Sequence, residues 1–100
     1  MWNNMINQLV LEGRVLGKPE VNDDETKVEF YSLNYRDFVH DGVERESTDM
    51  YRIVSFNNEN NIARLLKNGD RVIITGVLNT LDDDVVQIIA DEVIEAKKSL

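Results

Sequence analysis

The sequence predicts an all-β fold in which five strands close into a small barrel, with one short helix between the third and fourth strands. Two observations support this prediction. Several segments show the period-two pattern or the short apolar run of a strand, whereas apolar residues at helical spacing occur in one short segment. Gly13 and Gly76 fall inside two of the expected strands, where a small barrel needs sharp bends or bulges.

The first half of the chain predicts two strands and their connections. Strands are expected at about residues 6–15 and 27–35, because apolar residues alternate with polar ones in both segments. Residues 17–25 contain glycine, proline and acidic residues and are expected to form turns. The segment 36–48 contains the turn signal His40-Asp41-Gly42, which is typical of either an exposed hairpin loop or a pair of strand extensions.

The second half predicts three strands and the helix. A strand is expected at residues 50–56, where alternate residues share a face. Residues 62–66 carry apolar side chains at helical spacing, which predicts a helix of two to three turns that Asn58 caps and Asn68-Gly69 ends. The remaining elements are a strand at 72–78, a tight acidic turn at 81–84 and a strand from 85 to about 93.

The order β-β-β-α-β-β, with the lone helix after the third strand, is the connectivity of the oligonucleotide/oligosaccharide-binding (OB) barrel. Five strands and a short helix could also form an open sheet. The bend glycines, and a helix too short to cover a sheet face, favour the closed barrel. We therefore expect a single OB-fold domain over residues 1–100, with the barrel at about 4–95 and a short tail at 96–100.

The composition is that of a soluble globular protein, with 42% apolar and 30% charged residues. The first residues lack the pattern of a secretion signal, and the chain has no cysteine for disulfides or thiolate metal sites. We therefore expect a cytoplasmic, nucleoid-associated protein. The net charge of −8, from 19 acidic and 11 basic residues, argues against indiscriminate binding of nucleic acid unless the cations gather on one face.

The sequence does not predict an enzyme, a metal site or a cofactor. His40 has no cysteine or second histidine with which to share a metal ion, and we expect it to be a solvated loop residue. The carboxylates at 82–84 could meet a hard cation, but three adjacent carboxylates cannot all turn towards one ion, so a solvated turn is favoured. The chain contains no phosphate-binding glycine loop, nucleophile elbow or nucleotide fingerprint.

Binding of single-stranded nucleic acid has better support, because such binding uses cations beside aromatic rings on which bases stack. Tyr35 and Arg36 supply this pair at the end of the second strand, and Arg52 and Phe56 supply it on one face of the third. Phe56 could instead be a core ring, and Tyr35 an ordinary exposed strand tyrosine. Arg52 argues against a buried Phe56, since a guanidinium is rarely buried without a partner.

The chain resembles the DNA-binding domain of bacterial single-stranded DNA-binding proteins, in a short form that lacks the acidic C-terminal tail. The likeness runs from Asn4 to about Glu95 and is carried by Asn7–Val15, Val28–Phe30, Tyr35–Asp37, Met50–Phe56 and Asn61–Leu78. The last of these segments is the most specific. It follows the family pattern of an apolar helix that ends in Leu-x-Lys-Gly. A strand with the pattern x-Val-x-Val-x-Gly-x-Leu comes next.

The resemblance implies binding of single-stranded DNA without sequence specificity, in replication, repair or recombination. Carried over by position, Tyr35 and Phe56 would be stacking platforms, and Arg14, Arg36 and Arg52 would contact the DNA backbone. The resemblance also implies a homo-oligomer, a tetramer as in the family or a dimer as in a short OB relative, with the edge of the first strand as a pairing surface. Contacts with other replication or repair proteins would follow.

Two departures from the family affect the expected binding surface. Met50 stands where the family has its first aromatic residue of the third strand. The long basic loop that the family has between the fourth and fifth strands is reduced here to the acidic segment 80–84. The alternative from another functional class is therefore an OB-fold protein-interaction or assembly module with weak or lost DNA binding.

Overall fold

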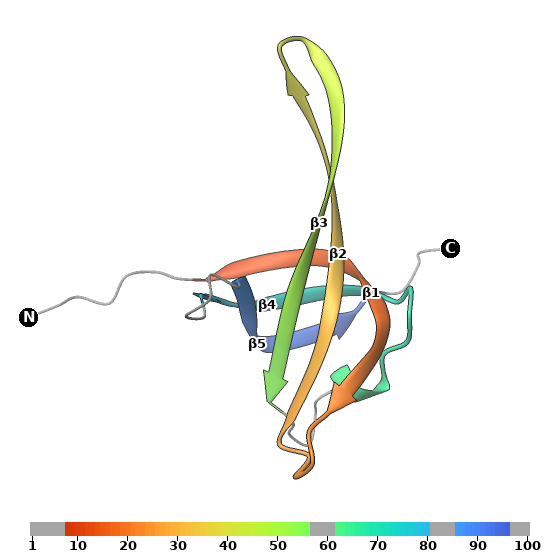
Figure 1. Cartoon of the computed structure of the whole chain (residues 1–100), viewed down its shortest axis with the longest axis vertical. Helices are drawn as coiled ribbons and strands as arrows, with labels where there is room; N and C mark the ends of the chain where they lie inside the picture. Colours follow the sequence, from red (N-terminus) through yellow and green to blue (C-terminus); the bar gives the residue numbers. More distant parts are fainter. Residues whose placement is uncertain (1–7, 57–61, 81–85, 97–100) are drawn as a thin grey trace, which may run out of the picture.

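Five strands and one short helical turn make up the part of the chain that the computed structural model describes, residues 8–56, 62–80 and 86–96. The elements in chain order are β1 (Leu9–Val21), β2 (Lys27–His40), β3 (Val43–Phe56), the 3-10 turn η1 (Ala63–Leu65), β4 (Arg71–Thr80) and β5 (Val86–Glu95). Figure 1 shows the strands wrapped into a barrel from which the β2–β3 hairpin projects. The predicted order of elements is confirmed.

The barrel closes because β1 pairs with two different strands. Around the ring the order is β1-β2-β3-β5-β4, in which β3 and β5 are parallel and the other neighbours are antiparallel. The first half of β1, up to Arg14, pairs with β4, and the second half pairs with β2 from Arg14 onward. The closed barrel is therefore correct, and the open sheet is excluded.

Gly13 lies one residue before this exchange of partners, where β2 comes close to β1. A Cβ at Gly13 would meet the hydroxyl group of Ser32 and would lie 2.9 Å from the carbonyl oxygen of Leu33. The predicted glycine of the first strand is thus needed for close approach of two strands.

The second half of β1 is irregular. Gly17 has φ +78°, and the register of β1 against β2 shifts between Leu16 and Glu20. Such a bulge bends the strand, so β1 continues around the barrel and ends at Val21. The strand is therefore longer than the predicted segment, which ended at residue 15.

β2 and β3 form an antiparallel hairpin whose register is unbroken along their whole length. Asp41 and Gly42 make the two-residue turn at its end, and both have positive φ, 53° and 76°, as the turns that match strand twist require. Residues 35–46 are all exposed, and Figure 1 shows this end of the hairpin standing clear of the barrel. Of the two predicted alternatives, the strand extensions are correct.

The core is filled by inward-facing strand residues and by two residues at η1. Its buried apolar members are Val15, Val28, Phe30, Ile53, Ala63, Leu66, Val72, Ile74, Ile88 and Ala90. Two buried polar side chains of β2 join them: the Ser32 hydroxyl donates to Asn34 Oδ1 at 3.2 Å, and Asn34 Nδ2 donates to the carbonyl oxygen of Glu12. These bonds satisfy polar groups that would otherwise be costly to bury, and the bond from Asn34 ties β2 to β1.

The helix is shorter than predicted. A single 3-10 turn forms at Ala63–Leu65, and Leu66 already has extended angles of φ −68° and ψ 149°. The chain is then held against β1, because Gly69 N donates to Val15 O at 2.7 Å and Val15 N donates to Asp70 O at 2.9 Å. Within residues 62–70, the return to the barrel wall therefore follows a single helical turn in place of the predicted two to three.

The apolar residues that predicted the helix do not form one buried stripe. Leu66 is buried and Ile62 is partly buried, but Leu65 is 68% exposed. The predicted cap Asn58 and the predicted turn at 81–84 lie outside the described residues. Within the described segments, no helix is long and apolar enough to cross a membrane.

Gly76→Ala should destabilise the barrel. Gly76 lies at a register shift between β4 and β5, which confirms the predicted irregularity. A Cβ there would meet the carbonyl oxygen of Ile89 and would lie 3.0 Å from the Cα of Ala90. Because these backbone atoms cannot rotate away, we expect urea denaturation to show a free energy of unfolding lower by about 1–3 kcal/mol.

Asn79→Ala is the control, because Asn79 is an exposed residue of the same strand. We expect its free energy of unfolding to stay within about 0.5 kcal/mol of the wild type. Equal stability of the Gly76→Ala variant and the wild type would contradict the close approach of β4 and β5.

Candidate nucleic-acid interface

The outer surface of β1, β2 and β3 forms one continuous face, which we call the β1–β3 face. The strand registers arrange its side chains in four rows: Arg14, Leu33 and Met50; Leu16, Tyr31 and Arg52; Glu20, Glu29 and Val54; Lys27 and Phe56. Tyr35, opposite Thr48, continues the same face onto the hairpin. In β2 and β3 these residues alternate with the residues that enter the core, although Val54 is buried in spite of its place on the outer side.

Aromatic rings are exposed along this face. Tyr35 is 64% exposed, Phe56 is 57% exposed and Tyr31 is 45% exposed. The exposure of Phe56 shows that it is not a core ring. Met50, at the position where an aromatic residue was expected, is also exposed. The face therefore presents large apolar side chains to solvent on the side away from the core.

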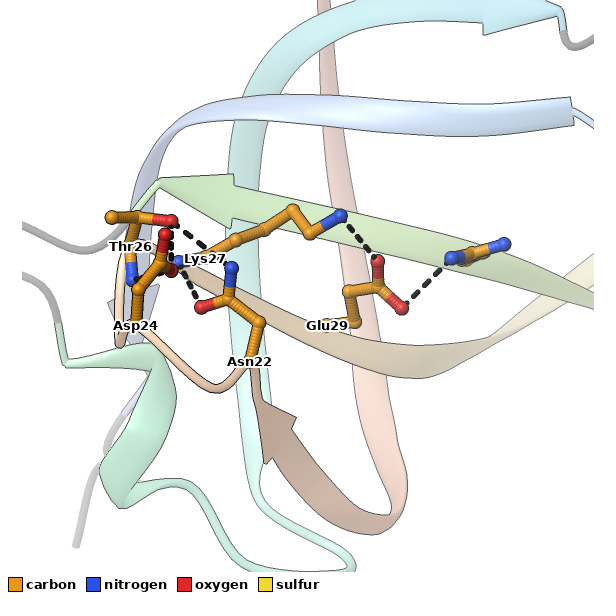
Figure 2. A network of polar contacts seen from close by, with 6 residues as sticks. Asn22, Asp24, Thr26, Lys27 and Glu29 are labelled. Carbon is orange, nitrogen blue, oxygen red and sulfur yellow. Dashed lines mark hydrogen bonds and ion pairs between the residues drawn. The ribbon is translucent and has the colours of Figure 1, made fainter.

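Two cations of the face, Arg52 and Lys27, contact one carboxylate. Arg52 Nη2 donates to Glu29 Oε2 at 2.8 Å, and Lys27 Nζ lies 3.2 Å from Glu29 Oε1. Figure 2 shows Glu29 with a separate contact at each carboxylate oxygen. The guanidinium that was predicted to contact DNA thus already has an acidic partner on the neighbouring strand.

The same contacts keep Glu29 ionised. Partial burial acts to raise the pKa of its carboxyl group, but the hydrogen bonds and positive charges of Arg52 and Lys27 outweigh burial and hold the pKa below its ordinary value. In the β1–β2 turn, hydrogen bonds from the hydroxyl and the backbone N–H of Thr26 hold the pKa of Asp24 below its ordinary value (Figure 2). Both carboxylates are therefore charged at neutral pH.

Arg14 lies at the edge of the face. It lines a hollow together with Glu12, Gly13, Tyr35 and Arg71. Arg14 Nη1 donates to the carbonyl oxygen of Gly69 at 3.2 Å, and Arg71 forms an ion pair with Glu12. The structure thus brings together Arg14 and Tyr35, two residues predicted from distant parts of the sequence.

Arg36 lies on the opposite side of the hairpin from Tyr35, because adjacent strand residues point to opposite sides. Its guanidinium carbon is 5.3 Å from the centre of the Phe38 ring, which is within the range of a cation–π contact. Arg45 pairs with Phe38 across the hairpin. The structure therefore separates Tyr35 from Arg36, which the sequence analysis had grouped as one site.

At the exposed end of the hairpin, basic and acidic side chains lie on opposite sides of the two strands. By strand alternation and register, one side carries Arg36, Phe38, His40, Val43 and Arg45, and the other carries Asp37, Val39, Glu44 and Glu46. We call these the basic side and the acidic side. His40 is exposed, and its Nε2 lies 3.4 Å from Asp41 Oδ2.

Tyr31 and Lys27 belong to the face but were not among the residues predicted from the sequence to bind DNA. Two signals could have found Tyr31. Alternation along β2 places it on the same face as Tyr35, and the two-residue turn at Asp41-Gly42 fixes the register that sets Tyr31 opposite Arg52. Because the register extends to the base of the hairpin, it also sets Lys27 opposite Phe56.

The described part of the chain contains no group of three or more histidine or carboxylate side chains that could hold a metal ion. The carboxylates at 82–84 lie outside the described residues. The face itself presents exposed rings and cations beside one another.

Comparison with known protein families agrees with this surface. Residues 6–93 match the family described as the Single-strand binding protein family. The chain belongs to this family. A search of the curated proteins gives no match.

Solved structures with the same fold include two single-stranded DNA-binding proteins. The chain is 22% identical to the Plasmodium falciparum single-strand binding protein in complex with single-stranded DNA, with a TM-score of 0.77 over 97% of this chain and 100% of that one. A small single-stranded DNA-binding protein from Streptomyces coelicolor is 17% identical, with a TM-score of 0.75 over 93% and 96%. The PriB protein of Ralstonia solanacearum is 9% identical, with a TM-score of 0.70 over 93% and 100%.

Arg52→Ala should raise the pKa of the Glu29 carboxyl group. The substitution removes a hydrogen bond and a positive charge that stabilise the ionised form, and it leaves Lys27 at the other oxygen. An NMR titration of the side-chain carboxyl carbons measures this pKa. Asp24 is the internal control, since its partner Thr26 is unchanged and its pKa should not move. A Glu29 pKa equal to that of the wild type would show that the contact with Arg52 is absent in solution.

Proposed function

We propose that the β1–β3 face binds single-stranded DNA without sequence specificity. Tyr31, Tyr35 and Phe56 would stack on bases, and Arg14 and Arg52 would contact phosphates. The observation that carries this proposal is the exposure of these rings beside cations on one face of the sheet. Membership of the Single-strand binding protein family supports the class of ligand.

The arrangement suits a ligand of any sequence. Every base has a face that can stack, and each base stacked on an aromatic side chain contributes about 1–3 kcal/mol. Tyr31 lies directly opposite Arg52, so one row offers a ring for a base and a cation for a phosphate. Tyr35 stands four residues further along β2, about 13 Å at the rise of an extended strand, which leaves room for a separate base.

Arg36 would contact the DNA backbone from the basic side of the hairpin, which faces away from Tyr35. A strand stacked on Tyr35 would have to pass the edge of the hairpin to reach the basic side, where Arg36 and Arg45 flank Phe38. We therefore assign Arg36 to a phosphate contact that is separate from the one near Tyr35.

We expect modest affinity and a role within replication, repair or recombination. The chain has a net charge of −8, and Arg52 and Lys27 are paired with Glu29, so the electrostatic part of binding is small. We further propose that the protein is a cytoplasmic homo-oligomer, a tetramer or a dimer, as the resemblance to the family implies.

Fluorescence anisotropy with a labelled oligo-thymidine of about 35 nucleotides tests the proposal, at low and near-physiological salt. The single strand should bind with micromolar or tighter affinity, a duplex of equal length should bind more weakly, and binding should weaken as salt rises. Absence of binding at low salt would favour the alternative function, an OB-fold protein-interaction or assembly module. The acidic side of the hairpin offers such a module a charged surface.

Tyr35→Ala should weaken binding of the oligo-thymidine by about fivefold to a hundredfold, because it removes one stacking platform. Leu65→Ala is a matched control, since Leu65 is a large, exposed apolar residue on η1, outside the β1–β3 face. Its affinity should equal that of the wild type. Equal affinities of the Tyr35→Ala variant and the wild type would remove Tyr35 from the site.

A further inference from the structure

Glu29 occupies the middle of the β1–β3 face, where a phosphate-binding surface would be expected to carry no negative charge. Each of its oxygens is engaged by a different cation, Arg52 at 2.8 Å and Lys27 at 3.2 Å. Tyr31 follows Glu29 on the same face of β2, directly opposite Arg52. The carboxylate therefore lies between the cations and next to one of the exposed rings.

We propose that Glu29 is an internal counter-ion that competes with DNA phosphates for Arg52 and Lys27, and thereby limits the affinity of the face for single strands. The inference rests on the proposed function, because it concerns the strength of binding at that same face.

The competition follows from the chemistry of the pair. Carboxylate and phosphate oxygens both accept charge-assisted hydrogen bonds from guanidinium and ammonium groups. A phosphate that takes Arg52 from Glu29 leaves the carboxylate with Lys27 as its one cation and close to the DNA, and the two negative charges repel. The Arg52 and Glu29 side chains are 33% and 25% exposed, so the pair is less screened by water than a fully exposed pair.

The residues around Glu29 indicate that it is the carboxylate that competes with phosphate for the cations of the face. Glu20 on β1 pairs with Glu29 in the register, but in the described part of the chain it forms no ion pair. Lys18 lines the same hollow as Arg52 and Glu29, and Val54, opposite Glu29 on β3, is uncharged. Because its pKa lies below the ordinary value, Glu29 is charged throughout the neutral range and acts as a fixed counter-ion.

An alternative role for Glu29 makes the opposite prediction. A carboxylate that orients Arg52 towards a phosphate would be a positioning residue, and its removal would weaken binding. A carboxylate that competes with phosphate would strengthen binding when it is removed. The sign of the change in affinity therefore separates the two roles.

Glu29→Gln tests the proposal, because it removes the charge and keeps the size of the side chain. We expect the oligo-thymidine to bind about fivefold more tightly than to the wild type at low salt. The slope of log affinity against log salt should steepen by about 0.7 for each phosphate that Arg52 or Lys27 newly neutralises. Thermal unfolding of the variant checks that the barrel remains folded.

Glu20→Gln is the matched control, since it removes the same charge from the neighbouring strand without releasing a cation. It should give a smaller gain in affinity and leave the salt slope unchanged. In an Arg52→Ala background, Glu29→Gln should give a smaller gain than in the wild type, because one of the two cations it releases is gone.

The outcomes distinguish this inference from the proposed function. If the wild type binds and Glu29→Gln binds no more tightly than Glu20→Gln, the counter-ion role is wrong and the proposed function stands. If Glu29→Gln weakens binding, Glu29 is a positioning residue and the inference is overturned. If neither the wild type nor Glu29→Gln binds the single strand, both the proposed function and the inference are wrong.

Discussion

The register of the β2–β3 hairpin determines which side chains meet on the candidate interface. The two-residue turn at Asp41-Gly42 sets Tyr31 opposite Arg52 and Lys27 opposite Phe56. A slip of one residue would turn every side chain of one strand to the other side of the sheet. Arg52 would then enter the core in place of Ile53, so burial and the turn specify the same register.

The closure of the barrel gives this hairpin a rigid base. β1 leaves β4 and joins β2 at Arg14, and Gly13 allows the strands to approach closely there. Because the ring is closed, the inner side of β2 and β3 is filled by core residues and their outer side is left for a ligand. Beyond the barrel both sides of the hairpin are exposed, and there the charges can be sorted into a basic and an acidic side.

The net charge of −8 describes the whole chain and does not describe the face. Arg14, Lys27 and Arg52 lie on the barrel part of the β1–β3 face, and the acidic side of the hairpin continues the same face beyond Tyr35. Glu20 and Glu29 are the carboxylates in the rows of that face, and Glu29 is paired with two of its cations.

The sequence by itself determined the five strands, because the period-two pattern of a strand is a local property of the chain. The order of the elements and the bend glycines Gly13 and Gly76 predicted the closed OB barrel, and the pattern predicted several side chains of the candidate interface. Tyr35, Arg52 and Phe56 followed from that alternation, and the Asp41-Gly42 turn contained the register that sets Tyr31 opposite Arg52. The tertiary structure decided the length of the helical turn, since backbone bonds from β1 to residues 69 and 70 pull the chain back to the barrel. It also decided that Glu29 holds Arg52 and Lys27, because an ion pair depends on which long side chains meet across neighbouring strands, and neither composition nor periodicity contains that information.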